Sequence, residues 1–183
     1  LILICFFVPM LPFLIILIFI FIDKKVFYFQ TRIGFNKKKF IILKFSSMLH
    51  NKSKKEIDPL ENYEKRINLL GKIIRKLHID EIPQLFNILK GDMSFIGPRP
   101  FSIKHNELYK KILENNNFLT RKYDDRFNVK PGIMGLAQAL LGGPENEVHI
   151  KKRIIYDLIY VKKNCLSLKF FIILKCVQKT LKF

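Results

Sequence analysis

The chain of 183 residues has the length of a single domain with a core of its own. Its 33 lysine and arginine residues outnumber the 15 acidic residues, and the formal net charge of +18 predicts a polyanionic partner: nucleic acid, anionic lipid or a phosphorylated substrate. The cysteines, Cys5, Cys165 and Cys176, are odd in number and lack metal-ligand spacing. This argues against a disulfide framework and indicates a reducing compartment.

Residues 1–22, LILICFFVPMLPFLIILIFIFI, carry no charged side chain. As a helix rising ~1.5 Å per residue they would reach ~33 Å, about one bilayer hydrocarbon core, so we predict a membrane-inserted helix here. No small-residue cleavage site follows, which argues against a signal peptide. Pro9 and Pro12 predict a kink or a break. Two arrangements stay open: a kinked spanning helix, and a re-entrant helix that enters and leaves through one leaflet.

Basic residues follow the apolar segment. Residues 23–55 contain ten lysine or arginine residues and one acid, Asp23, which predicts that this part of the chain lies on the cytoplasmic side. Each such cation adds ~1 kcal/mol of attraction to anionic lipid. Residues 166–183 place Lys175, Lys179 and Lys182 on one side of an otherwise apolar helix. We expect this amphipathic helix to lie in the membrane interface, with packing against the rest of the domain as the alternative.

Between these ends, residues 23–183 predict an α+β domain with a small β-hairpin and several helices. Residues 25–34 and 39–48 are rich in β-forming residues and flank a turn, which is typical of a hairpin. Residues 51–66 are polar and predict a surface loop. Residues 67–78 have a roughly helical spacing of apolar side chains.

The next segment, DEIPQLFNILKG, predicts an amphipathic helix from Asp80 as N-cap to Gly91, with apolar side chains at Ile82, Leu85, Phe86 and Leu89. Asp80 and Glu81 at its start have two interpretations. A carboxylate caps free N–H groups at a helix N-terminus. It is also held ionised there, near donors that favour phosphate, as a reactive centre requires. Adjacent residues point about 100° apart, so the two carboxylates would have different tasks.

Two further loops carry candidate groups. In GPRP, residues 97–100, Arg99 stands between two prolines, and a guanidinium restricted in this way suits phosphate or a base edge as a bidentate donor. An ion pair with a nearby acid is the alternative. Residues 128–138, NVKPGIMGLAQ, contain a turn at Lys130-Pro131-Gly132. Neither loop decides the function alone.

Together these segments resemble the bacterial sugar transferase family, the small monotopic phosphoglycosyl transferases. The resemblance covers nearly the whole chain and rests on VFYFQTRIG, FIILKFSSM, LHIDEIPQLFNILKGDMSFIGPRP, VKPGIMGLAQ, YDLIYVKKN and LSLKFFIILKCVQKTL. It implies an enzyme that transfers a sugar 1-phosphate from a UDP-sugar to polyprenyl (undecaprenyl) phosphate and releases UMP. The product would begin a glycan: a capsule, O-antigen, exopolysaccharide or glycoprotein. No residue in the sequence identifies the sugar.

The resemblance also implies a site. Asp80 corresponds to the family's nucleophile, which forms a covalent phosphosugar intermediate, and Asp80 and Glu81 correspond to carboxylates that act with Mg²⁺. Substrate or phosphate contacts are implied for Arg75, Arg99, Lys44, Arg32 and Asp157. The family carries a re-entrant helix broken at a Ser-Pro pair. Pro9 matches that proline, although Val8 replaces the serine, and the resemblance therefore favours the re-entrant arrangement on the cytoplasmic face of the bacterial inner membrane.

The chain departs from the family pattern at several positions. Ser46 stands where a basic residue is common, and residues 137–146, AQALLGGPEN, lack the arginine of the family's AQVNGRN. Lys151, Lys152 and Arg153 are candidates to replace it. A second hypothesis is therefore a membrane-anchored scaffold or lipid-binding relative with weak or no catalysis. We expect no nucleic-acid partner, because no nucleic-acid motif accompanies the charge; a homodimer stays open.

Overall fold

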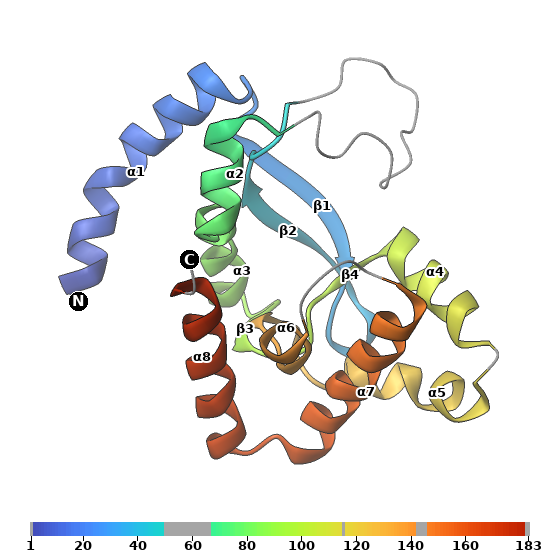
Figure 1. The fold of residues 1–183 in the computed structure, drawn as a ribbon. Helices are drawn as coiled ribbons and strands as arrows, with labels where there is room; N and C mark the ends of the chain where they lie inside the picture. Colours follow the sequence, from blue (N-terminus) through green and yellow to red (C-terminus); the bar gives the residue numbers. More distant parts are fainter. Residues whose placement is uncertain (1, 50–66, 115, 142–145, 182–183) are drawn as a thin grey trace. The chain divides into compact units, whose positions relative to one another are not determined.

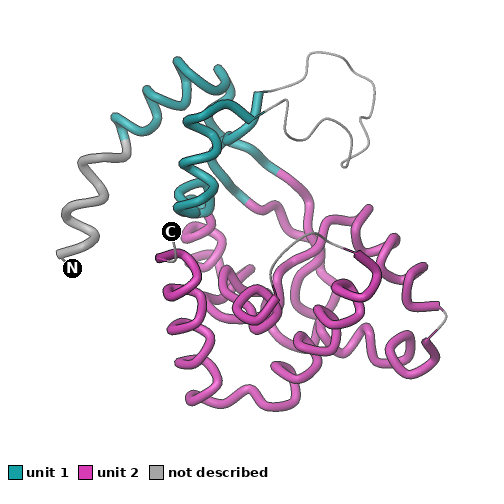
Figure 2. Tube along the Cα trace, viewed as in Figure 1, with its two compact units in different colours: residues 1–29, 43–83 teal, residues 30–42, 84–183 magenta. Residues whose placement is uncertain are grey.

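The structure is a computed structural model that describes residues 2–49, 67–114, 116–141 and 146–181, with side chains from residue 12 onward. The chain combines helices with small β-sheets, which confirms the predicted α+β class (Figure 1). It divides into two compact units: unit 1 comprises residues 1–29 and 43–83, and unit 2 comprises residues 30–42 and 84–183 (Figure 2). The loop predicted over residues 51–66 lies outside the described residues.

Strands β1 (Phe27–Ile33) and β2 (Lys39–Phe45) form the predicted hairpin, and each unit contains part of it. A short 3₁₀ turn, η1 (Phe35–Lys37), joins the strands. Asn36 lies in the left-handed region with φ of 50°, which asparagine tolerates better than most residues. β1 also pairs antiparallel with β4 (Phe101–Ser102), so the strand order is β2-β1-β4.

In unit 1, helix α1 (Ile2–Phe21) packs against α2 (Leu69–Lys76) and the start of β1 and end of β2. The core is a cluster of buried apolar side chains from these elements: Ile18, Ile22, Phe45 and Ile74. Asn68 links the two helices, because its side-chain oxygen accepts a hydrogen bond from the Gly71 N–H while its amide donates to the Phe21 carbonyl. The C-terminal end of α1 is therefore fixed to the helix that leads into η3 (Ile79–Glu81).

Helix α1 runs without interruption through Pro9 and Pro12. The sequence predicts a kink or a break at these prolines, and a proline can bend a helix without ending it. A re-entrant path of this segment in a membrane stays a prediction. Across the described parts of the chain, no helix is both long and apolar enough to cross a membrane. Insertion of residues 1–22 into a membrane stays a prediction, as does the boundary predicted after residue 22.

Unit 2 contains a parallel pair of strands and most of the helices. β3 (Ser94–Ile96) pairs with β5 (Gly132–Met134), with Ser94 opposite Gly132 and Ile96 opposite Met134. The helical elements of this unit are α3 (Gln84–Leu89), α4 (Ile103–Leu113), α5 (Asn117–Lys122), η4 (Tyr123–Asn128), α6 (Leu136–Leu140), α7 (Glu147–Lys163) and α8 (Leu166–Leu181). One buried cluster joins β4, α4, α5, η4 and α7, and a second joins α6, α7 and α8.

Helix α8 has two different faces. Ile172 is fully buried and packs in the cluster with Leu136 and Tyr160. Lys179 donates to the carbonyls of Gln138 and Leu141 at the C-terminal end of α6. The other face is apolar and exposed, with Leu166, Phe170, Leu174, Val177 and Leu181. The C-terminal helix is thus confirmed; it packs on unit 2 with one side and leaves an apolar side uncovered.

Helix α3 corrects the helix predicted from Asp80 to Gly91. The chain makes a single 3₁₀ turn, η3, and a separate helix begins at Gln84, directly after Pro83. Asp80 therefore lies inside η3. The N-cap position belongs to His78, which makes no side-chain cap bond. Gly91 ends the helical segment as predicted, with a φ of +82° that glycine adopts without strain.

In α3 the polar side chains are buried and the apolar side chains are exposed, which is the reverse of the arrangement in a helix at an aqueous surface. Gln84 and Asn87 are 1% and 4% exposed, and the Asn87 side-chain amide donates to the Ile41 carbonyl. The large apolar side chains are exposed instead: Leu85, Phe86 and Leu89. The predicted amphipathic spacing is correct, but the apolar face points away from the protein.

The buried phenol of Tyr123 predicts loss of stability in alkali. Burial raises its pKa well above the usual range, although Arg126 opposes the shift, and its hydroxyl donates to Asn106. Above about pH 10 an unfolded tyrosine loses its proton while the native one keeps it, so the unfolding free energy falls as pH rises. Tyr123→Phe is expected to lose about 1 kcal/mol at neutral pH but to show a shallower fall above pH 10. Denaturant unfolding in detergent across this pH range measures both slopes; equal slopes would contradict the assignment.

Candidate active site

The two adjacent carboxylates lie in unit 1, in η3, which follows α2. His78, between α2 and η3, has a left-handed φ of 55°, a conformation that costs energy for a residue with a side chain and often marks functional sites. Asp80 and Glu81 are 8% and 6% exposed. Aspartate and glutamate are seldom buried this far without a charged partner. These two side chains therefore require cations nearby.

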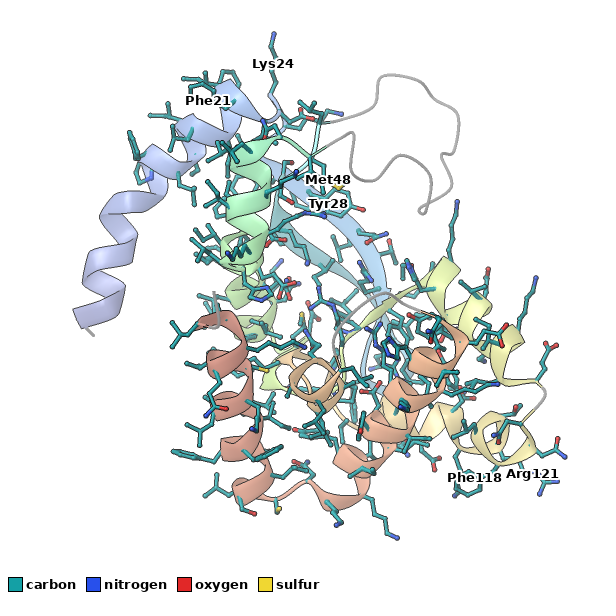
Figure 3. The ribbon with its side chains drawn as sticks, viewed as in Figure 1. Phe21, Lys24, Tyr28, Met48, Phe118 and Arg121 are labelled. Atoms are coloured by element: carbon teal, nitrogen blue, oxygen red, sulfur yellow. The ribbon has the colours of Figure 1, made fainter. Side chains whose placement is uncertain are left out.

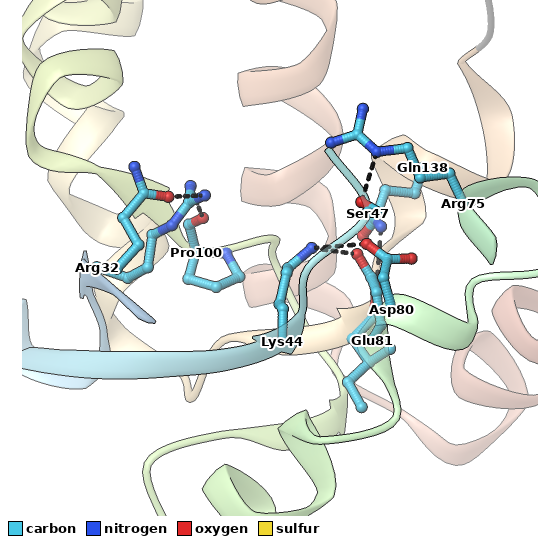
Figure 4. A network of polar contacts seen from close by, with 10 residues as sticks. Arg32, Lys44, Ser47, Arg75, Asp80, Glu81, Pro100 and Gln138 are labelled. Carbon is cyan, nitrogen blue, oxygen red and sulfur yellow. Dashed lines mark hydrogen bonds and ion pairs between the residues drawn. The ribbon is translucent and has the colours of Figure 1, made fainter. Parts of the chain in front are cut away.

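Lys44, near the end of β2, supplies one such cation. Its Nζ donates to Glu81 Oε1 at 2.7 Å and lies 3.8 Å from Asp80 Oδ2 (Figure 4). One ammonium thus serves both carboxylates, but unequally. Glu81 is hydrogen-bonded to the lysine, whereas the Lys44–Asp80 contact is at ion-pair distance. That the two acids have different tasks stays a prediction.

Arg75, in the last turn of α2, supplies a second cation to unit 1. Its Nε donates to Ser47 Oγ at 2.8 Å, and Ser47 is itself 5% exposed (Figure 4). Gly71, one turn earlier, allows α2 to approach this segment, because a Cβ at that position would lie 2.4 Å from the Ser47 carbonyl oxygen. Ser47 is a site residue that the sequence reading missed. No strand pattern marks it, because β2 ends at Phe45.

Unit 1 therefore brings together four of the predicted site residues: Lys44, Arg75, Asp80 and Glu81. A carboxylate kept ionised by neighbouring cations can act as a nucleophile. The same cations can stabilise negative charge that develops on a phosphoryl group. The site therefore places carboxylates and cations in an arrangement that suits phosphoryl chemistry.

The donor atoms also suit a hard divalent cation. No group of three or more histidine, cysteine, aspartate or glutamate side chains is arranged to hold a metal ion in the described portion of the chain. Mg²⁺ does not need such a group, because it is commonly held by one or two carboxylates together with substrate phosphates. Asp80 and Glu81 fit Mg²⁺ in that form, bound jointly with a phosphorylated ligand.

In unit 2, the predicted residues gather around the loop of residues 96–100. Arg99 lies between Pro98 and Pro100, and Arg126 of η4 donates to its backbone carbonyl at 2.8 Å. The Arg126 guanidinium also lies 3.7 Å from the ring centre of Phe101, stacked on it. Arg126 was not among the predicted site residues. Nothing in the local sequence DDRFN distinguishes it from a surface arginine.

Asp157 forms a buried ion pair in unit 2. It is 2% exposed on α7, and its Oδ2 accepts from Arg126 Nη2 and Nε at 2.8 Å and 3.1 Å. Burial raises the pKa of this carboxyl, and the Arg126 charge opposes the shift. In this structure the carboxylate makes an internal ion pair with Arg126. A contact of Asp157 with substrate stays a prediction.

Arg32 also makes internal contacts. Its guanidinium donates to Gln30 Oε1 at 2.5 Å and to the Pro100 carbonyl at 3.2 Å (Figure 4). Arg153, a candidate to replace the missing family arginine, donates to the hydroxyl of Tyr109 at 3.2 Å. Arg153 is thus directed into the α4–α7 core. Residues 142–145, in the loop that departs from the family pattern, lie outside the described residues.

Comparison with known proteins identifies the family of the chain. The model of the family described as bacterial sugar transferase matches residues 1–183. The chain belongs to the bacterial sugar transferase family. The resemblance noted in the sequence is thereby confirmed.

Several relatives are known by activity. A UDP-glucose:undecaprenyl-phosphate glucose-1-phosphate transferase of Xanthomonas campestris pv. campestris is 39% identical over 141 residues, 75% of this chain and 28% of that protein. A UDP-N-acetylgalactosamine-undecaprenyl-phosphate N-acetylgalactosaminephosphotransferase of Aeromonas hydrophila is 35% identical over 156 residues, 85% of this chain and 35% of that protein. The sugar transferase EpsL of Bacillus subtilis, itself uncharacterized, is 38% identical over 160 residues, 87% of this chain and 72% of that protein. The chain thus spans about a quarter to a third of the two enzymes of stated activity.

Proposed function

We propose that the protein transfers a sugar 1-phosphate from a UDP-sugar to polyprenyl phosphate through a covalent intermediate on Asp80. The observation that carries the proposal is the buried Asp80–Glu81 pair with Lys44 at 2.7 Å from Glu81 and 3.8 Å from Asp80. The relatives from Xanthomonas and Aeromonas, named as undecaprenyl-phosphate transferases of two different UDP-sugars, support the donor and acceptor classes. The product would be the first lipid-linked intermediate of a glycan.

The chemistry follows a double displacement. An Asp80 carboxylate oxygen attacks the β-phosphorus of the UDP-sugar, a new oxygen–phosphorus bond forms, and the bond to the UMP oxygen breaks. A phosphate oxygen of the polyprenyl phosphate then attacks the same phosphorus and releases Asp80 as a carboxylate. Lys44 and Arg75 stabilise the charge on the transferred phosphoryl group. Glu81 holds Lys44 in place through its hydrogen bond.

Mg²⁺ completes the proposed site. Asp80 and Glu81 would hold it, together with the donor diphosphate, and the ion supplies charge neutralisation for the diphosphate and the leaving UMP. The residues of this chain provide the nucleophile, its orientation and the fixed cations.

We further propose that the protein is a monotopic protein of the bacterial inner membrane, on its cytoplasmic face. Each unit supports this independently. In unit 1, apolar side chains are exposed along α1 and α2, and Phe21 and Lys24 both project outward (Figure 3). In unit 2, apolar side chains are exposed on α3 and α8. Exposed apolar surface of this extent on several helices marks a membrane or protein contact. Residues 1–22 would enter the bilayer as a re-entrant helix.

The test is release of UMP from a panel of UDP-sugars in detergent, with polyprenyl phosphate and Mg²⁺. We expect one or a few sugars to be turned over, and a chelator to stop the reaction. The panel would also identify the sugar. A folded, vesicle-bound protein that releases no UMP from any donor would reject the transferase and favour the membrane-anchored scaffold, which the missing arginine in residues 137–146 already suggests as the second candidate.

Ser47 provides a matched pair of variants for this assay. Ser47→Ala removes the acceptor that orients Arg75, so we expect turnover to fall about tenfold, in line with one lost hydrogen bond to a charged group. Ser47→Thr keeps the hydroxyl and should retain most of the activity. If alanine and threonine variants turn over at the same rate, the Ser47–Arg75 contact has no part in the reaction.

A further inference from the structure

We infer that Arg126, Asp157, Tyr160 and Arg32 are positioning residues, which hold the backbone of residues 96–100 so that the Arg99 guanidinium is oriented to bind the diphosphate of a nucleotide. The inference rests on the proposed function, since it takes a nucleotide diphosphate as the ligand of Arg99. It assigns a task to Asp157 and Arg32 through the contacts that they make within the protein.

The backbone of residues 96–100 is held almost entirely from outside the loop. Prolines have no N–H, so Pro98 and Pro100 leave carbonyl oxygens as the main points of attachment. Four of these oxygens accept hydrogen bonds from other segments: Ile96 from the Tyr160 hydroxyl at 2.9 Å, Pro98 from the Gly132 N–H at 3.0 Å, Arg99 from Arg126 at 2.8 Å and Pro100 from Arg32 at 3.2 Å. The Gly97 N–H also donates to the Met134 carbonyl at 2.9 Å.

Arg126 makes the central attachment. It is 3% exposed, and its guanidinium bridges the Asp157 carboxylate and the Arg99 carbonyl while it stacks on Phe101. A buried ion pair contributes little stability over an apolar pair of equal volume, because both charges must be desolvated. Its geometry, by contrast, is strict. A fork of donors fixed between a carboxylate and a carbonyl sets the position of the peptide that carries Arg99.

Helix α7 controls two of these attachments at once. Asp157 and Tyr160 are three residues apart and so lie on the same face of the helix. Asp157 acts on the Arg99 carbonyl through Arg126, and Tyr160 acts directly on the Ile96 carbonyl. One rigid helix therefore holds both the beginning and the middle of the loop.

Such rigidity matters for an arginine that binds a diphosphate. Bidentate recognition of phosphate requires the plane of the guanidinium to be oriented as well as near. A displacement of about 1 Å in a group that positions substrate can lower the rate by roughly 10²-fold. With its backbone fixed, Arg99 has only its side-chain torsions left to order when the donor binds.

The decisive variant is Arg126→Lys. It keeps a cation opposite Asp157, but a single ammonium cannot reproduce the fork that also reaches the Arg99 carbonyl. We expect the KM for the UDP-sugar to rise about tenfold, with kcat and the KM for polyprenyl phosphate within about twofold of wild type. Arg121→Lys is the matched control: it changes an exposed arginine of α5 in the same unit.

A double-mutant cycle with Arg99→Ala separates positioning from general destabilisation. If Arg126 acts through Arg99, Arg126→Lys should have no further effect on the donor KM once Arg99 is absent. Additive effects would overturn the inference, as would an unchanged donor KM in Arg126→Lys. Tyr160→Phe removes the hydroxyl that bonds to the other end of the loop, and it should raise the donor KM in the same way. This variant replaces Arg126→Lys in the test if Arg126→Lys does not fold.

Titration with UDP distinguishes failure of this inference from failure of the proposed function. Wild type should bind UDP about tenfold more tightly than Arg126→Lys, whether or not UMP is released in the turnover assay. Equal affinity for UDP in the two proteins would reject the positioning role. Absence of turnover together with the expected loss of UDP affinity would reject the transferase reaction and leave the positioning role intact.

Discussion

Replacing Asp80 by asparagine will abolish the transfer of label from a UDP-sugar to the protein. In the absence of polyprenyl phosphate, wild type incubated with a donor labelled in its β-phosphate should retain one labelled phosphosugar per chain. Asparagine has the same shape but no anionic oxygen, so no oxygen–phosphorus bond can form. UMP release should fall by at least ~10³-fold, the effect expected for loss of a nucleophile. Acid-quenched samples followed by mass measurement of the intact protein detect the adduct directly.

Two other variants make the result specific. Glu81→Gln frees Lys44 from its partner, so turnover should fall strongly while the adduct on Asp80 still forms slowly. Asp125→Asn, at an exposed acid paired with Lys122, should behave as wild type. An adduct of equal yield in Asp80→Asn would show that Asp80 is not the nucleophile, and an adduct lost only in Glu81→Gln would exchange the roles of the two acids.

Gly132→Ala will lower the stability of unit 2 more than the same substitution at any other glycine described in that unit. A Cβ at this position would lie 2.1 Å from the Gly97 backbone nitrogen and 2.6 Å from the Ile96 carbonyl carbon. Because these are backbone atoms of the paired strand, no side chain can move aside to make room. We expect the unfolding free energy to fall by about 3 kcal/mol, the upper part of the range for overpacking. Denaturant unfolding in detergent measures it.

The neighbouring residue supplies the control for this prediction. Ile133→Val, on the same strand, removes one methylene and should cost only about 1 kcal/mol. Donor binding should also weaken in Gly132→Ala, since the Gly132 N–H donates to the Pro98 carbonyl next to Arg99. A Gly132→Ala protein as stable as Ile133→Val would mean that the two strands separate without loss, contrary to the close approach described here.

Local patterns in the sequence were enough for the hairpin, the α+β class and the C-terminal helix. They also contained the correct start of α3. Proline is favoured in the first turn of a helix, and Pro83 directly precedes Gln84, so the helix begins there and not at Asp80. The prediction gave more weight to the capping preference of aspartate than to the position of this proline.

Other features depend on contacts that no local pattern records. Periodicity shows which side chains of α3 share a face, but not that Leu85, Phe86 and Leu89 face outward while Asn87 faces inward. The close approach of Gly97 and Gly132 depends on a parallel pairing between strands far apart in the sequence. The burial of Asp157 depends on Arg126, from a different element. A role carried over from a family assigns importance to such a residue without saying through which atoms it acts.

Because the leucines and the phenylalanine of α3 face outward, the stability of the protein should depend on the amphiphile that surrounds it. Covering apolar surface contributes about 25 cal/mol per Å², and lipid or detergent that binds only the native state raises stability as any ligand does. The melting temperature should therefore vary with the amphiphile and its concentration. In plain buffer the same side chains can be covered only by another copy of the chain, so dilution of detergent below its micellar concentration should lead to self-association before unfolding.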